Sequence, residues 1–368
     1  MKIIKFIKNN KKIILLLFLC IVLGIILGYA YYNIQMDTFI PNNKITTPQP
    51  IDLVIPWSGE NNPGDKEYSS LANRDEGILK YSIRSIIKHA PWIRTIYIFK
   101  DPPNNYPSWL DKEKVSHKIK IIDRCPYFKN KDWCPSMNAS AIEANIYKIN
   151  GLSDNYLTIE DDTLLMNDIH YTDFFTKDMK KLKSNCHFPL KDIYNPEKVK
   201  KGSIKPPKSP KMFSGGDSHV MIAQKKELYA ELYKKYPEWF DFVSSHKKRW
   251  CCCDDTCPDP DDDCKSCYDE LNIYMRVPHY EAYLQDKYEY RDEIPSMGTD
   301  NHYNFVENLI KIQNKEKTVT FYNINNIYTQ NDYQRKKPEE FEKKKLKLHN
   351  KLEEMFPEKE FYINIYNL

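Results

Sequence analysis

The stretch Ile51-Asp-Leu-Val-Ile55 is an apolar run that ends at Pro56, and it predicts a buried β-strand. Three later runs also predict strands, namely Thr95–Phe99, Ile119–Ile122 and Tyr156–Ile159. Strand signals are therefore concentrated between residues 51 and 159.

Helical patterns alternate with these strands. From Asp75 to His89 the apolar residues recur at helical spacing, and Pro91 ends the pattern. Asn138 to Ile149 predicts a second helix between the third and fourth strands. This alternation predicts a mostly parallel sheet with helices on both faces, and ligands of such sheets bind at the carboxyl ends of the strands.

The pattern changes beyond residue 170. Two stretches, Lys225 to His246 and Pro338 to Met355, predict helices, and strand signals are few. Between them, Cys251 to Cys267 is rich in cysteine and aspartate. We expect this half to form a helical, cysteine-containing lid over the sheet.

The N-terminus predicts a membrane anchor. Ile13–Ile34 contains 22 residues without a charge, enough at about 1.5 Å per residue to cross the ~30 Å hydrocarbon core. The lysines of residues 1–12 make this segment a cytoplasmic stub, and residues 35–50, which include three prolines, predict a stem. Residues 51–368 then form one domain on the other side, with an insertion at about 250–268. A cleaved signal peptide, the alternative, has a shorter apolar run and a small-residue cleavage site.

Charge argues against nucleic-acid binding. Taking the five lysines of the stub from the 55 basic residues leaves 50, against 51 acidic residues. The domain is thus close to neutral, whereas nucleic-acid binding requires a clustered basic excess.

Three carboxylates, Glu160-Asp161-Asp162, directly follow the fourth predicted strand. Adjacent carboxylates repel one another and persist mainly where a cation or a proton is shared. Mg²⁺ or Mn²⁺ bound by one or two carboxylates and by substrate phosphates fits this pattern, and a solvated acidic turn is the alternative. His219 and Arg249 flank a predicted helix and are, taken alone, unspecific.

Four stretches occur in the order found in a known family. The most specific runs from Arg74-Asp-Glu-Gly-Ile-Leu-Lys-Tyr81 through Asn138-Ala-Ser-Ala-Ile-Glu143 to Asp162. The others are Ile51–Gly59, Ser218–Arg249 and Tyr328–Phe361. Together they resemble the Stealth family of sugar-1-phosphate transferases, which includes the lysosomal-enzyme GlcNAc-1-phosphotransferase of animals and bacterial capsule polymerases.

The resemblance implies a Rossmann-like (GT-A-like) α/β fold and a reaction. A sugar-1-phosphate passes from a nucleotide-diphosphate sugar, such as UDP-GlcNAc, to a hydroxyl of a glycan acceptor. A phosphodiester forms and nucleoside monophosphate leaves. Two alternatives stay open: a metal-dependent glycosyltransferase that moves the sugar alone, and a non-catalytic glycan-binding membrane protein.

The resemblance also implies roles for individual residues. His219 is the expected general base for the acceptor hydroxyl, and Arg249 is expected to bind phosphate. Asp161 and Asp162 form the catalytic acidic centre, which with Glu160 holds Mg²⁺ or Mn²⁺. The expected substrate-binding residues are Asp52, Trp57, Arg74, Arg84, Asn138, Glu143, Asn331 and Asp332, although Arg74 and Arg84 are equally compatible with a surface helix.

This chain departs from the family at several positions. Glu160 stands where relatives carry Asn, and Ile55-Pro56 replaces an aromatic residue and threonine. The cysteines of 251–267 have no counterpart, and disulfides, a structural Zn²⁺ site and Ca²⁺ on the aspartates are the alternatives. Cys125 and Cys134 bracket a short loop and are candidates for a disulfide.

The resemblance and the anchor together imply a location and partners. The domain is expected in the Golgi or endoplasmic reticulum lumen, or outside a bacterial membrane. The sequon Asn138-Ala-Ser140 is expected to stay unglycosylated because the resemblance places Asn138 in the site. The donor sugar, the acceptor, the metal and the formation of a homodimer stay open.

Overall fold

The computed structural model describes residues 22–24, 46–59, 77–101, 106–136, 138–185, 220–245, 247, 276–297, 305–324 and 338–366. Contacts divide the chain into two units, Met1–Ile45 with Asn367, and Thr46–Tyr366 with Leu368. Most of the predicted stub, anchor and stem lies outside the described residues, as does the Cys- and Asp-rich stretch. Among the described residues, no helix is long and apolar enough to cross a membrane.

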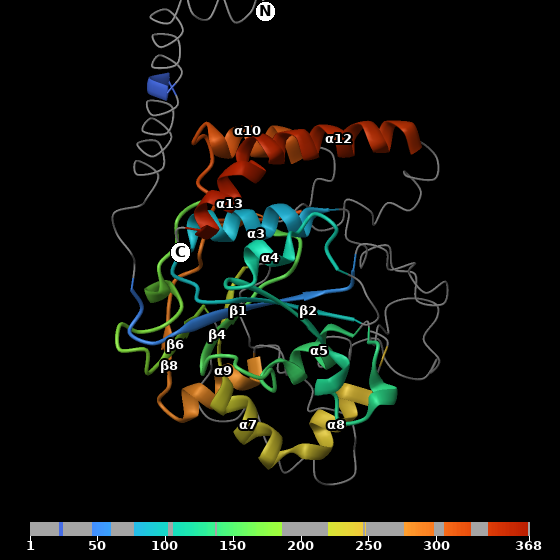
Figure 1. Ribbon diagram of the computed structural model, residues 1–368. Coiled ribbons are helices and arrows are strands. Elements are labelled where there is room, and N and C mark those ends of the chain that lie inside the picture. Colours follow the sequence, from blue (N-terminus) through green and yellow to red (C-terminus); the bar gives the residue numbers. More distant parts are fainter. Residues whose placement is uncertain are drawn as a thin grey trace, which may run out of the picture. The chain divides into compact units, whose positions relative to one another are not determined.

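A five-stranded sheet in the order β3-β2-β1-β4-β7 forms the centre of the second unit (Figure 1). The first four strands are parallel, and β7 is antiparallel to β4. The predicted α/β fold with a mostly parallel sheet is thus confirmed, and all four predicted strands are present. Their bounds are β1 Ile51–Trp57, β2 Ile96–Lys100, β3 Ile119–Asp123, β4 Asn155–Thr158 and β7 Ile222–Lys225.

Burial explains why these runs form the sheet. Every residue of β2 and β4 is buried, and only Pro56 of β1 is partly exposed. Central parallel strands are covered on both faces and therefore consist of nearly continuous apolar residues. In β3, which lies at the edge of the sheet, Lys120 and Asp123 are exposed. The covered core thus lies around β1, β2 and β4.

Helices lie on both faces of the sheet, as predicted (Figure 1). On one face lie α3 (Ile78–His89) and α4 (Lys112–Val115). On the other lie α5 (Ala139–Ile146), α7 (Lys226–Lys235), α8 (Pro237–Ser245) and α9 (Arg276–Leu284). One prediction was wrong in detail, because the single helix expected from Lys225 to His246 is two helices. Tyr236 leaves the helical conformation before Pro237, in keeping with the restriction that proline places on the residue before it.

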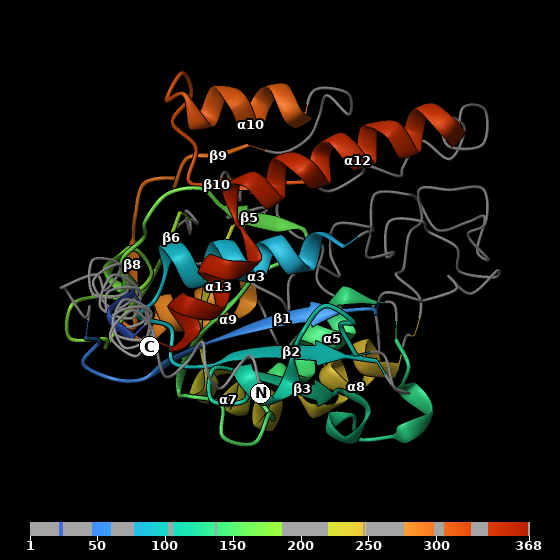
Figure 2. The ribbon, with the colours of Figure 1, turned by 45° about the horizontal axis from the view of Figure 1, so that its top comes forward.

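The C-terminal segments pack over α3 (Figure 2). The predicted helix Pro338–Met355 is confirmed as α12, and it is followed by α13 (Glu358–Tyr366). Strands beyond residue 170 are more numerous than predicted, because this half contains β6 to β10. With β5, four of them form two small sheets, of order β5-β10-β9 and β6-β8. The remaining elements are β5 Thr163–Leu165, β6 Leu182–Ser184, β8 Tyr288–Tyr290, β9 Ser296–Met297, β10 Phe321–Asn323, α10 Phe305–Gln313, η2 Cys125–Tyr127, η3 Lys131–Trp133 and η4 Tyr171–Asp173.

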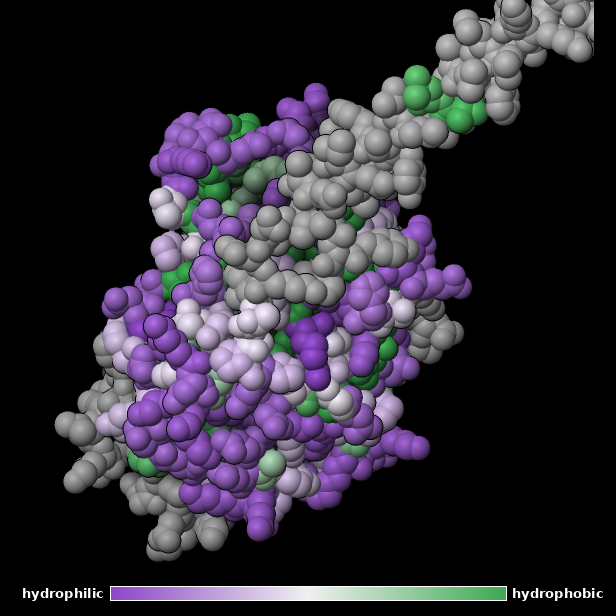
Figure 3. All heavy atoms as spheres, turned by 60° about the vertical axis from the view of Figure 1, so that its left-hand side comes forward, coloured by the Kyte–Doolittle hydropathy of each residue, from purple (hydrophilic) through white to green (hydrophobic). Residues whose placement is uncertain are grey.

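The described surface is mostly hydrophilic on the face shown in Figure 3, with small hydrophobic areas between the polar side chains. This agrees with the 29% of charged residues in the chain.

A buried histidine ties the small β6-β8 sheet to the central sheet. His279 on α9 donates from Nε2 to the Ala223 carbonyl of β7 (2.8 Å) and accepts at Nδ1 from the Ser184 hydroxyl (3.1 Å). These partners fix the neutral tautomer. Burial, opposed by the Ala223 hydrogen bond and assisted by the charge of Arg291, lowers the pKa of His279 to about 4.

Stability is therefore expected to fall in acid. Between pH 6.5 and 4 the unfolded His279 binds a proton that the folded residue does not, so this histidine alone lowers the free energy of unfolding by about 2 kcal/mol at pH 5. Urea midpoints at pH 7 and pH 5 test this. His279→Gln should show a smaller difference between the two pH values than the wild type, whereas a variant of the exposed His170, His170→Gln, should keep it. Equal differences in all three proteins would contradict the prediction.

Candidate active site

Polar side chains gather where the parallel strands end. Asp101 follows β2, Arg124 follows β3, and Glu160, Asp161 and Asp162 follow β4. Because parallel strands end at one edge of a sheet, these residues share the edge at which α/β proteins bind ligands. The edge also holds an ion pair between Lys100, the last residue of β2, and Asp123, the last residue of β3.

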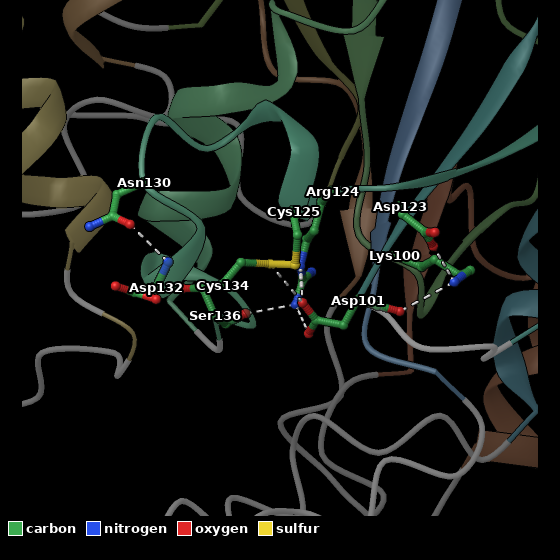
Figure 4. The surroundings of a disulfide bond; sticks show 9 residues. All are labelled: Lys100, Asp101, Asp123, Arg124, Cys125, Asn130, Asp132, Cys134 and Ser136. Carbon is green, nitrogen blue, oxygen red and sulfur yellow. Dashed lines mark hydrogen bonds and ion pairs between the residues drawn. A yellow bond between two sulfur atoms is a disulfide. The ribbon is translucent and has the colours of Figure 1, made fainter.

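A buried arginine joins three segments at this edge (Figure 4). Arg124, fully buried, donates from Nε and Nη2 to the two carboxylate oxygens of Asp101. Its Nη2 also donates to the Ser136 carbonyl (2.6 Å), and its backbone N–H donates to the Lys100 carbonyl (2.9 Å). Burial raises the pKa of the Asp101 carboxyl, and the Arg124 guanidinium opposes that rise. Neither residue was among the predicted site residues, although each lies two positions after the end of a predicted strand.

The predicted acidic centre forms a turn between β4 and β5. Glu160, Asp161 and Asp162 are each partly exposed. Asn323 at the end of β10 donates from Nδ2 to Asp162 Oδ1 (2.9 Å) and is 3.2 Å from Glu160 Oε2. The backbone N–H of Ile324 donates to the Asp162 carbonyl (2.9 Å). A residue 161 positions away thus fixes the turn, and no signal in the sequence pointed to it.

The predicted residues of α5 reach the same edge. Asn138 is the N-cap of the helix, and its side-chain oxygen accepts a hydrogen bond from Ser140 N–H (3.0 Å). Glu143 lies on the next turn and is buried. Burial, and then the nearby Glu160 carboxylate, raise the pKa of Glu143 well above its usual value. The Glu143 carboxyl therefore interacts electrostatically with the acidic turn.

The acidic turn has the chemistry of a site for a hard cation. Carboxylate oxygens are the ligands that Mg²⁺ and Mn²⁺ prefer, and the carboxylates of Glu160 and Asp162 share one hydrogen-bond donor. Among the described residues, the one group of three metal-ligating side chains whose ligand atoms lie within 4.8 Å of one another is Asp101, Cys125 and Cys134, so the three carboxylates of the acidic turn do not converge to that degree. That group is unsuited to a metal, because its sulfurs form a disulfide and Asp101 is paired with Arg124.

The expected disulfide between Cys125 and Cys134 is present (Figure 4). It closes a loop over a sequence separation of 9 residues, with 5.3 Å between the two Cα atoms. Cys125 directly follows Arg124, so the bond lies beside the buried ion pair.

Asp52 and Arg84 belong to the packing of the fold rather than to the site. Asp52 lies at the amino end of β1, about 16 Å of strand away from Trp57 at the carboxyl end. Its buried carboxylate accepts hydrogen bonds from Arg94 Nε (2.8 Å) and Ser153 N–H (2.7 Å). It therefore joins the start of β1 to its neighbours at the edge opposite to the acidic turn, and we remove it from the candidate site.

Arg84 is a buried residue of α3. Its Nη1 donates to both carboxylate oxygens of Glu353, each at 2.9 Å, and to the Phe356 carbonyl at 3.1 Å. It thus connects α3 to α12 and α13, and we assign it to the packing of these helices instead of phosphate binding. Trp57 is buried at the carboxyl end of β1, so its placement agrees with the predicted edge.

Several predicted site residues lie outside the described residues. These are His219, Arg249, Arg74, Asn331 and Asp332.

Comparisons with known proteins agree with the family resemblance. Residues 72–183 match the family model described as Stealth protein CR2, conserved region 2. The capsular polysaccharide phosphotransferase eps5J of Streptococcus thermophilus is 41% identical over 110 residues, which are 30% of this chain and 44% of that protein. The human N-acetylglucosamine-1-phosphotransferase subunits alpha/beta are 33% identical over 112 residues, 30% of this chain and 9% of that protein. The matches thus span less than half of the length of these relatives.

Among solved structures, the glycosyltransferase GlyE of Streptococcus pneumoniae in its apo form is similar with a TM-score of 0.37 and 10% identity, covering 84% of this chain and 64% of that one. The galactosyltransferase LgtC, in complex with donor and acceptor sugar analogues, has a TM-score of 0.37 and 11% identity, covering 80% of this chain and 95% of that one.

The matched region contains Asp101, Arg124, Asn138, Glu143 and the acidic turn. The resemblance seen in the sequence is therefore confirmed over residues 72–183, and this chain carries conserved region 2 of the Stealth proteins.

Proposed function

We propose that this chain is a sugar-1-phosphate transferase. It transfers a sugar-1-phosphate from a nucleotide-diphosphate sugar, such as UDP-GlcNAc, to a hydroxyl of a glycan acceptor. The products are a phosphodiester and a nucleoside monophosphate.

One observation carries the proposal. Residues 72–183, which match the Stealth CR2 model, supply the acids at the carboxyl edge of the sheet, and named phosphotransferases are 41% and 33% identical to this chain over 110 and 112 residues. Phosphoryl transfer depends mostly on positioning and on neutralising charge on the phosphoryl oxygens. Asp161, Asp162 and Glu160 would hold Mg²⁺ or Mn²⁺, which supplies that neutralising charge when bound.

Further residues are needed to accept the proton of the acceptor hydroxyl and to bind the phosphate of the donor. In this proposal His219 accepts the proton of the acceptor hydroxyl, Arg249 binds phosphate, and Asn331 and Asp332 contact substrate. The course of β7 supports the role of His219. Ile222 pairs with Thr158 in antiparallel register, so the chain enters β7 through Val220 at the edge where β4 ends. His219 directly precedes Val220 in the sequence.

The proposal includes a location. The chain is a type II membrane protein anchored by residues 13–34, with its catalytic domain in a secretory lumen or outside a bacterial membrane. The Cys125–Cys134 disulfide supports this location, since disulfides persist mainly in oxidising compartments.

A screen of nucleotide sugars tests the function. The full chain is incubated with Mn²⁺ or Mg²⁺, each donor and a set of glycan acceptors, and the spent nucleotide is separated by chromatography. Nucleoside monophosphate is expected. Nucleoside diphosphate would instead identify an enzyme that moves the sugar alone, and no turnover with any donor would favour a glycan-binding protein.

A further inference from the structure

Arg124 holds the start of α5. Its guanidinium bonds the Ser136 carbonyl, and the Ser136 hydroxyl accepts a hydrogen bond from the Asn138 N–H (3.2 Å). Asn138 in turn caps the helix on which Glu143 lies one turn later. A chain of short contacts therefore runs from the end of β3 to the position of Glu143.

The same guanidinium is paired with Asp101 after β2. Burial lowers the pKa of Arg124, and the charges of Asp101 and then of Asp161 in the acidic turn oppose that change. A fully buried guanidinium is costly unless it is paired, and its two-pronged contact with Asp101 requires the geometry of arginine. Its Nη1 is buried and has no hydrogen-bond partner among the described residues.

We infer that Arg124 is a positioning residue of the active site, which sets the place of Glu143 relative to the acidic turn. This inference rests on the proposed function. The ion pair with Asp101 fixes the orientation of the guanidinium. The hydrogen bond to the Ser136 carbonyl then fixes the position of the residues at the start of α5. Glu143 is an expected substrate-binding residue, and a displacement of about 1 Å in a group that positions substrate costs up to about 100-fold in rate. We therefore expect kcat to depend on Arg124.

Arg124→Lys is the decisive variant. Lysine keeps the charge but lacks the planar fork that bonds both Asp101 oxygens and Ser136 at once. We expect kcat to fall about 10- to 100-fold. KM for the nucleotide sugar that the wild type uses should rise as well, because Asn138 and Glu143 are expected substrate-binding residues. Arg124→Met should lose at least as much kcat.

Amide hydrogen exchange provides a readout that does not depend on turnover. In Arg124→Lys the amides of Asn138, Ser140 and Ile142 should exchange at least about tenfold faster, while β6 and β8 keep the wild-type rate. If no nucleotide sugar is turned over, the proposed function fails, but exchange still supports or overturns the placement of α5 by Arg124.

A control variant distinguishes the effect of the Arg124 guanidinium from that of the disulfide-closed loop beside it. Cys125→Ser with Cys134→Ser opens the loop and leaves Arg124 intact, so kcat should stay within about threefold of the wild type. The inference is overturned if this variant loses as much kcat as Arg124→Lys. It is also overturned if Arg124→Lys accelerates exchange everywhere alike or nowhere, or changes exchange at α5 without lowering kcat.

Discussion

Replacement of Asp162 by asparagine is expected to lower turnover at least about 100-fold without unfolding the protein. Asparagine has the same shape, and its side-chain oxygen still accepts the hydrogen bond from Asn323. The backbone contact with Ile324 is also unaffected. What is lost is one negative charge in the set of carboxylates that we propose as cation ligands, and divalent cations bind through such charges. The concentration of Mn²⁺ that gives half of the maximal rate should therefore rise.

Asp168→Asn is the matched control for this variant. Asp168 follows β5, is exposed, and pairs with His89 away from the acidic turn. Its replacement should leave kcat and the Mn²⁺ dependence within about twofold of the wild type. Turnover above half of the wild-type value in Asp162→Asn would remove Asp162 from the site.

Replacement of Glu353 by alanine is expected to destabilise the fold by about 3 kcal/mol. The side chain of Arg84 is 3% exposed and keeps its charge, so the variant leaves a buried guanidinium without the carboxylate that binds it through two oxygens. The Glu358 N–H at the start of α13 loses its acceptor as well. The Phe356 carbonyl and the Glu358 carboxylate, which is 3.9 Å from Arg84 Nη2, remain and limit the loss. Urea unfolding should show a lower midpoint with an unchanged slope.

The neighbouring residue provides the control. Glu354 pairs with Lys351 on the surface, where ion pairs contribute little, so Glu354→Ala should leave the midpoint unchanged. Arg84→Met combined with Glu353→Leu removes both charges and should be less destabilised than Glu353→Ala. Equal midpoints for Glu353→Ala and Glu354→Ala would show that Arg84 does not depend on this partner.

The central sheet could be predicted well from the sequence, because strands that are buried on both faces consist of short, mostly apolar runs. The strands around Ile51–Ile55 and Thr95–Phe99 are mostly apolar, and the helix that ends before Pro91 has its apolar residues at helical spacing. The same logic located the acidic turn, which directly follows such a strand. Features that arise from one segment can be predicted from that segment.

Contacts between residues far apart in the sequence could not be predicted, because no pattern in either segment indicates its partner. Asn323 ends a strand of three residues whose partner β5 is about 160 positions away, so its role at the acidic turn follows only from the fold. Arg84 was compatible with an exposed helix because the pattern of α3 does not reveal Glu353 as its partner. Asp52 was predicted to bind substrate, but it is the second residue of its strand, whereas ligands bind where strands end.

The central position of β1 in the sheet determines whether residues 72–183 can fold outside this chain. Residues 72–183 include β2, β3 and β4, but β1, which comes before them in the chain, lies between β2 and β4. Without the rest of the chain, residues 72–183 would lack β1, which lies between β2 and β4 in the sheet. The region is therefore part of a fold and not a unit that can fold alone. In a chimera that receives this region from a relative, β1 of this chain would pack between a β2 and a β4 that come from the relative. Whether the chimera folds would then depend on how well these two strands fit Ile51–Trp57.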